Sequence, residues 1–133
     1  MANINWLRLR DILGAHSTVI EFSGGSDGVR DIGLLESALA RPQNIHAYEP
    51  DAPITRLAAA YGFGIANNHP FVDGNKRAAF IAIELFLDLH EIRVEASEEE
   101  KYVTMMSLAA GELDESGLAA WLEDHAAPPQ SAK

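Results

Sequence analysis

The segment that begins at Asn75 and runs to about His90 constrains this chain most, because its composition fits a helix and little else. It is rich in helix-forming residues, contains neither glycine nor proline, and repeats apolar residues at helical spacing. Gly74 directly precedes it, so a loop becomes a helix at this point. The first turn of a helix has free N–H groups and a partial positive charge, roughly half an elementary charge, and so favours a bound anion.

The residues around this helix start are those expected for a metal-bound polyphosphate. Gly74 and Asn75 tolerate unusual backbone angles, which lets successive N–H groups turn toward one anion. Lys76 and Arg77 lie in the first turn, where a cation opposes the helix dipole unless it faces a phosphate. Asp73 could hold Mg²⁺, which usually binds one or two carboxylates together with substrate phosphates.

His69 lies four residues before Asp73 and could accept a proton from a hydroxyl near neutral pH, a role worth about 10²–10⁴ in rate. Each residue also has an ordinary alternative. Asp73 could only cap the helix, a single histidine is more often structural, and Lys76 and Arg77 could be solvated. Phe71 is expected in the core. Taken together, the residues favour a functional site.

The run His-Pro-Phe-Val-Asp-Gly-Asn-Lys-Arg at residues 69–77 resembles the signature of the Fic/Doc family. It is closer to the shorter Doc form, in which His-Pro-Phe-x-Asp is followed by Asn-Lys-Arg. Residues 28–42 resemble the upstream block of Doc-like proteins, and Trp121-Leu122 resembles the aromatic–aliphatic pair near their C-terminus. The resemblance implies an all-α fold, a compact helical bundle of about six helices with a short flap segment before the second helix.

The same resemblance implies a toxin of a toxin–antitoxin pair. Such a toxin would transfer a phosphoryl group from ATP, with Mg²⁺, to a threonine or serine hydroxyl of a target protein such as elongation factor Tu. A separate antitoxin would restrain it. The implied site residues are the catalytic base His69, the metal ligand Asp73, the phosphate-binding residues Gly74, Asn75, Lys76 and Arg77, and the target-docking flap of Ser23, Gly24, Gly25 and Ser26.

Two other functions stay open. Fic adenylyltransferases carry a later arginine that holds the nucleotide for AMP transfer, but Phe80 occupies that position here, and Lys76 replaces a common glycine. This departure disfavours nucleotidyl transfer (AMPylation or NMPylation) to a protein hydroxyl. The chain could also be an inactive peptide-binding module, which the complete motif disfavours. A P-loop is excluded because no Gly-x-x-x-x-Gly-Lys-Ser/Thr run occurs.

Composition narrows the class of protein. The formal net charge of −10 over 133 residues disfavours extended nucleic-acid binding, which needs a basic surface. The absence of cysteine excludes disulfides and thiolate chemistry. No apolar run reaches the roughly 20 residues of a membrane span, and no signal peptide is evident, so we expect a cytoplasmic protein. We expect one domain over residues 1–125 and a flexible tail over residues 126–133.

Periodicity and helix breakers predict the order of elements. Residues 17–22 are short and β-branched, and residues 23–28 form a glycine-rich break. Arg30 and Asp31 are expected to be a structural pair or a helix cap, and His16 is a weak candidate near an expected helix end. Helices are expected over residues 6–15, 31–40 (ending near Arg41-Pro42), 51–67, 75–90, 97–110 and 114–124.

Overall fold

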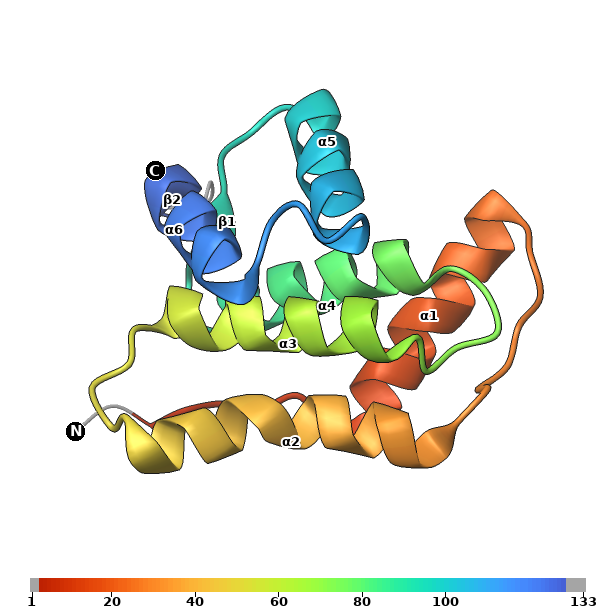
Figure 1. Cartoon of the computed structure of the whole chain (residues 1–133), viewed down its shortest axis with the longest axis horizontal. Coiled ribbons are helices and arrows are strands. Elements are labelled where there is room, and N and C mark those ends of the chain that lie inside the picture. The colour runs from red at the N-terminus through yellow and green to blue at the C-terminus, as the bar shows by residue number, and fades with distance from the viewer. Residues whose placement is uncertain (1–2, 129–133) are drawn as a thin grey trace.

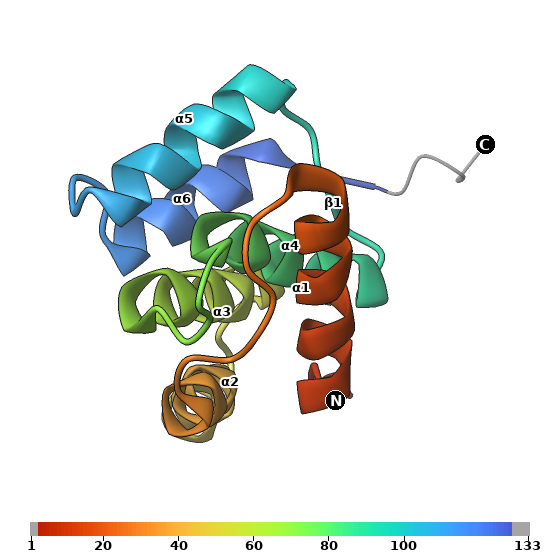
Figure 2. The same cartoon turned by 90° about the vertical axis from the view of Figure 1, so that its right-hand side faces the viewer.

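The computed structural model describes residues 3–128, and within them the chain is a bundle of six helices with one very short sheet (Figure 1). The all-α expectation is therefore confirmed. In Figure 2, α1 stands across the ends of the other helices, with α2 on one side of the bundle and α5 and α6 on the other. The elements are α1 (Leu9–Ser23), α2 (Ile32–Tyr48), α3 (Ile54–Asn68), α4 (Asn75–Leu89), β1 (Arg93–Val94), α5 (Glu98–Ala109), α6 (Glu115–His125) and β2 (Ala126–Ala127).

Helix α3 is the centre of the bundle and contacts α2, α4 and α6 extensively. Its small residues allow this close packing. A Cβ on Gly64 would lie 3.2 Å from the Cβ of Ala38 on α2, and one on Gly62 would collide with Ile83 on α4. The helix that carries the start of the motif is thereby locked between its neighbours, which fixes where its C-terminal end lies.

The N-terminal segment is tied to the core through Tyr61 of α3. This side chain is fully buried, and its hydroxyl oxygen accepts a hydrogen bond from the Leu7 N–H at 3.0 Å. Burial raises the pKa of Tyr61 to about 12, although the Leu7 N–H favours the ionised form. The Tyr61 ring packs 5.0 Å from the ring of Phe86, which in turn stacks on Trp6.

Two sequence-based helix boundaries are wrong. Helix α1 begins at Leu9 rather than at residue 6 and continues through residues 17–22 to Ser23. The β-branched Val19 is buried on its inner face, and the Thr18 hydroxyl donates to the Gly14 carbonyl four residues earlier. Packing against the bundle thus outweighs the low intrinsic helix propensity of this segment.

The second wrong boundary is the end of α2, which continues past the buried Pro42 to Tyr48. Proline removes one intrahelical hydrogen bond but does not prevent a helix that is held by tertiary contacts. Arg41 makes a bidentate pair with Glu115 of α6, at 2.9 and 2.6 Å, which fastens the turn beside the proline. The hydrogen bond to Glu115 raises the pKa of Arg41 despite its partial burial.

The C-terminal part follows the expected order with one difference. Ser97 and Glu100 form the expected capping box of α5, and its hydrogen bonds lower the pKa of the exposed Glu100 carboxyl. Ala126 and Ala127, the first residues of the expected tail, pair with Arg93 and Val94 as a two-stranded antiparallel sheet. Residues 129–133 lie outside the described residues. Within residues 3–128, no helix is both long and apolar enough to cross a bilayer.

Candidate active site

The loop between α3 and α4, residues 69–74, is bracketed by two residues in the left-handed conformation. His69 is the C-cap of α3, with φ 49° and ψ 55°, and Gly74 is the N-cap of α4, with φ 74° and ψ 24°. Phe71 between them is only 1% exposed and anchors the loop in the core, as expected. The chain therefore reverses direction around a buried phenylalanine and leaves His69 and Asp73 exposed at the surface.

Arg30 holds the end of α3 in this shape. Its Nε donates to the His69 carbonyl at 2.8 Å, and its Nη2 donates to the Asn68 carbonyl at 2.9 Å. A left-handed backbone is unfavourable for histidine by about 1–2 kcal/mol, so contacts that fix the adjacent carbonyls help to maintain it. The neighbouring Asp31 caps α2 by accepting from the Leu34 N–H at 3.0 Å.

The side chain of Asn75 closes the loop from the other side. Its Oδ1 accepts from the Phe71 N–H at 2.9 Å, and its Nδ2 donates to the Phe71 carbonyl at 3.0 Å. The Asn75 side-chain amide is thus hydrogen-bonded to both the N–H and the carbonyl of Phe71. Asn75 was expected to bind phosphate, and in this structure its side chain organises the loop while its backbone N–H lies in the first turn of α4.

The glycine-rich segment of residues 23–30 runs beside the motif loop, as Figures 1 and 2 both show. Val29 forms an antiparallel bridge with Phe71. The Arg30 N–H donates to the Pro70 carbonyl at 2.7 Å, and the Val72 N–H donates to the Gly28 carbonyl at 3.1 Å. The segment that contains the expected target-docking flap thus pairs through its backbone with the motif loop of the same chain.

The carboxylate of Asp73 lies under the same segment. Its Oδ1 accepts from the Gly74 N–H at 3.1 Å, and its Oδ2 lies 3.4 Å from the Ser26 N–H. A Cβ on Gly25, which has φ +110°, would lie 2.9 Å from Oδ2. Glycine suits this position because L side chains rarely adopt φ +110°, and an added Cβ would also force the Asp73 carboxylate to shift.

A pocket of about 400 Å³ lies at the start of α4. The first intrahelical hydrogen bond of α4 joins the Ala78 N–H to the Gly74 carbonyl. Residues 75–77 lie in the first turn, before the donor of that bond. Arg77 reaches back across the pocket to contact the Ser23 hydroxyl at the end of α1. The expected site residues that line this one pocket are His69, Asp73, Gly74, Asn75, Lys76, Arg77, Ser23 and Gly24.

Comparisons with known proteins show the family of this chain. The model of the Fic/DOC family matches residues 6–87. The chain belongs to the Fic/Doc family. Toxin Doc of Mycolicibacterium smegmatis is 34% identical over 129 residues, covering 95% of this chain and 97% of its own. Protein kinase doc of Escherichia phage P1 is 32% identical over 109 residues, covering 82% of this chain and 86% of its own. The relationship to Doc proteins is therefore confirmed.

A weaker match is to the N-terminal Fic domain of a putative cell filamentation protein of Bartonella quintana, solved with bound ADP. The TM-score is 0.45 and the identity 15%, over 73% of this chain. The chain spans about half the length of that solved chain, 49%.

Within the described part of this Fic/Doc chain, no group of three or more His, Cys, Asp or Glu side chains could hold a metal on its own. The donor set still fits Mg²⁺ in one specific way. Mg²⁺ keeps several waters and commonly takes one or two carboxylates plus substrate phosphates. One exposed carboxylate, that of Asp73, beside a helix start that favours phosphate meets this description, with the remaining ligands coming from the nucleotide and water.

Two residues that hold this Fic/Doc site together were not among the expected ones. The sequence predicts a structural pair or a helix cap at Arg30, and its contacts to residues 38 and 39 positions away do not follow from local spacing. The sequence also predicts that the first helix ends at residue 15, which leaves His16 outside it. The spacing of Ile12, His16 and Val19 on one buried helix face was the signal that could have found it.

Proposed function

We propose that this chain is a Doc-like toxin that transfers the γ-phosphoryl group of ATP to a serine or threonine hydroxyl of a target protein. One observation carries the proposal: an exposed imidazole, an exposed carboxylate and the positive end of a helix line the same small pocket. Its relatives named Toxin Doc and Protein kinase doc support the same reading.

The start of α4 is the part of the pocket that would hold the phosphates. The N–H groups of Asn75, Lys76 and Arg77 point outward from the first turn of a 15-residue helix, where the helix dipole favours negative charge. The side chains of Lys76 and Arg77 are exposed and line the same pocket. These groups would absorb the charge that develops on the phosphoryl oxygens, which is the main task in phosphoryl transfer.

Asp73 would be the protein ligand of a Mg²⁺ ion that arrives with the nucleotide. When bound, the ion would supply positive charge that offsets the negative charge of the phosphates. Asp73→Asn keeps the shape and removes the negative charge, and its single amide oxygen can keep only one of the two contacts to backbone N–H groups. We expect this variant to lose most activity and to need more Mg²⁺ for what remains.

His69 would act as the general base. The hydroxyl oxygen of the acceptor attacks the γ-phosphorus, the bond from that phosphorus to the bridging oxygen breaks, and ADP leaves with the electron pair. The hydroxyl proton passes to the imidazole of His69. Within residues 3–128 this imidazole makes no hydrogen bond to another residue, so both of its nitrogens are available to an incoming substrate.

The acceptor and the restraining partner are proposed from the family resemblance. Elongation factor Tu is the candidate target, and a separate antitoxin is the expected partner. The flap of Ser23, Gly24, Gly25 and Ser26 would help to align the target, and its first two residues, Ser23 and Gly24, line the pocket. All four of these residues are exposed.

Phosphoryl transfer is preferred over nucleotidyl transfer because of Phe80. Its side chain is 8% exposed and lies edge-on to Trp121, with ring centroids 6.5 Å apart. It cannot supply the cation that AMP transfer uses at the corresponding position. Lys101 lies near its ring, but this ammonium group is paired with Glu84 and Glu98. Burial lowers the pKa of Lys101, and the contacts to the two glutamates outweigh burial and raise it.

The decisive experiment uses ATP labelled at the α or the γ phosphate, with purified elongation factor Tu and a bacterial extract as acceptors. Movement of the γ label alone is expected. Movement of the α label would replace the proposal with nucleotidyl transfer, and movement of neither would favour an inactive binding module. His69→Ala should abolish transfer and leave nucleotide affinity within a few-fold. His125→Ala, which removes a histidine stacked on Trp121 away from the pocket, is the matched control.

A further inference from the structure

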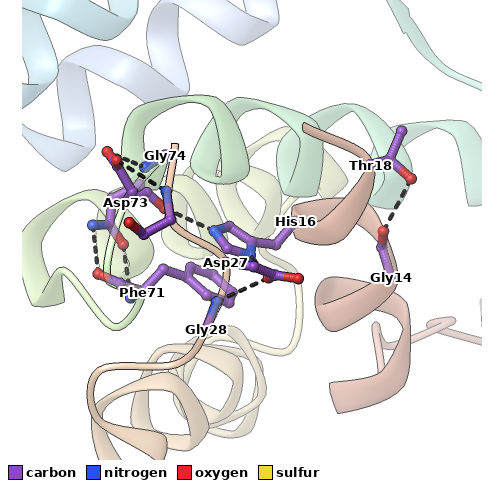
Figure 3. Close-up of polar contacts among 10 residues, drawn as sticks. Gly14, His16, Thr18, Asp27, Gly28, Phe71, Asp73 and Gly74 are labelled. Carbon is purple, nitrogen blue, oxygen red and sulfur yellow. Dashed lines mark hydrogen bonds and ion pairs between the residues drawn. The ribbon is translucent and has the colours of Figure 1, made fainter. Parts of the chain in front are cut away.

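A second histidine, His16, lies buried directly behind the pocket. It comes from the inner face of α1 and is 2% exposed. Its ring stacks on Phe71, with centroids 3.8 Å apart and planes 6° from parallel. Its Nε2 lies 2.7 Å from the Asp73 carbonyl oxygen, and its Nδ1 lies 3.6 Å from Oδ1 of Asp27 (Figure 3). The His16 side chain thus lies between α1, the glycine-rich segment of residues 23–30 and the motif loop.

The chemistry of these partners fixes the direction of the short contact. A backbone carbonyl oxygen has only lone pairs, so the hydrogen between His16 and Asp73 must be on Nε2. Asp27, the residue after the flap, lies on the other side of the ring, with Oδ1 3.6 Å from Nδ1 and beyond hydrogen-bond distance. The stack on Phe71 and the hydrogen bond from Nε2 hold the ring with Nε2 toward the motif loop.

The carbonyl of Asp73 belongs to the same planar peptide group as the N–H of Gly74. In a trans peptide these two groups point in opposite directions. A hydrogen bond from His16 to the carbonyl therefore directs the Gly74 N–H away from α1, to the side where the Asp73 carboxylate accepts it at 3.1 Å. The Gly74 N–H is thus occupied by the Asp73 carboxylate, and this contact helps to hold the carboxylate beside the start of α4.

Glycine leaves this peptide group free to turn unless something holds it. Gly74 has φ +74°, and a glycine can adopt the opposite sign of φ at little cost. We propose that His16 is a positioning residue for the candidate site: it fixes the Asp73–Gly74 peptide, and with it the Gly74 N–H that holds the Asp73 carboxylate. This inference rests on the proposed function for its role in transfer, but its structural part can be tested alone.

Two substitutions separate the hydrogen bond from the packing. His16→Phe keeps a ring that can stack on Phe71 and removes the donor. His16→Gln removes the ring but can carry an amide N–H close to the position of Nε2. If His16 acts as a donor, Gln should function better than Phe. If His16 only fills space, Phe should function better than Gln.

We expect His16→Phe to lower kcat about tenfold or more, as the loss of one buried hydrogen bond implies, and to weaken the binding of Mg·ADP measured by calorimetry. His16→Gln should remain within about threefold of the native protein. Thermal unfolding checks that both variants fold. If the Phe variant does not fold, folded His16→Gln with activity as low as that of His69→Ala would overturn the proposal.

Crystal structures of the two variants give a readout that does not depend on activity. The Asp73–Gly74 peptide should turn in His16→Phe and keep its orientation in His16→Gln. An unchanged peptide together with unchanged Mg·ADP affinity in His16→Phe refutes the positioning role, whatever the enzyme assay gives. If neither the native protein nor the two variants transfer phosphate, but the Asp73–Gly74 peptide turns in His16→Phe, the proposed function fails and the positioning role stands.

Discussion

Arg30 offers the sharpest test of how the candidate base is held. Arg30→Met keeps most of the side-chain length and removes both hydrogen bonds to the end of α3, at 2.8 and 2.9 Å. Arg30 is exposed, so each bond should contribute about 0.5–1 kcal/mol, toward the lower end of the usual range. The sum, about 1–2 kcal/mol, is similar to the roughly 1–2 kcal/mol that a left-handed backbone costs a histidine. Without Arg30, His69 should therefore leave its observed conformation for much of the time.

Two measurements follow from that estimate for Arg30→Met. The unfolding temperature should fall by roughly 3–10 °C for a chain of this size. The rate of phosphoryl transfer should fall by about 5–30-fold, because 1.4 kcal/mol corresponds to a factor of ten. Arg10→Met, at an exposed arginine on α1, is the control and should change neither quantity. A stable Arg30→Met protein with native activity would show that the two carbonyl contacts do not hold His69 in place.

Two further predictions concern the core and the helix start. Because the folded-state pKa of Tyr61 is raised to about 12, its contribution to stability is present below pH 10 and should be lost between pH 10 and 12. The loss of stability is about 2–3 kcal/mol, from a shift of about two pKa units. Chemical denaturation at a series of pH values measures this loss. Tyr61→Phe should flatten that part of the stability curve, whereas Tyr48→Phe, at an exposed tyrosine, should not. Gly74→Ala should cost about 1–2 kcal/mol of stability through its left-handed backbone and should also reduce transfer, since the added Cβ would lie 3.3 Å from Ile20. Native stability in Gly74→Ala would mean that the loop adopts another conformation.

The site could be predicted from the sequence as far as it is local. The motif loop and the start of α4 form a contiguous run, so spacing alone brings His69, Asp73 and the first helical turn together. The bundle of helices likewise follows from local periodicity and capping, as in the capping box at Ser97. These features depend on residues within a few positions of one another.

What could not be predicted depends on contacts between distant parts of the chain. Helix α2 continues past Pro42 beside a pair that joins Arg41 to a residue 74 positions away. Arg30 and His16 support the motif loop from 38 to 57 positions away, and no local pattern encodes these contacts. The hydrogen bonds of the Asn75 side chain to Phe71 could not be predicted either, because the sequence does not show whether an amide is already hydrogen-bonded within its own loop.

The close passage of Gly25 over the Asp73 carboxylate makes access to the site depend on a residue outside the motif. Any side chain at that position would be pressed against the oxygen that faces the flap, or would push the flap away from the loop. A family member could therefore be silenced, with every motif residue intact, by a single exchange in a segment that a motif search does not inspect. Such a chain would keep the signature of an active protein and lack its chemistry.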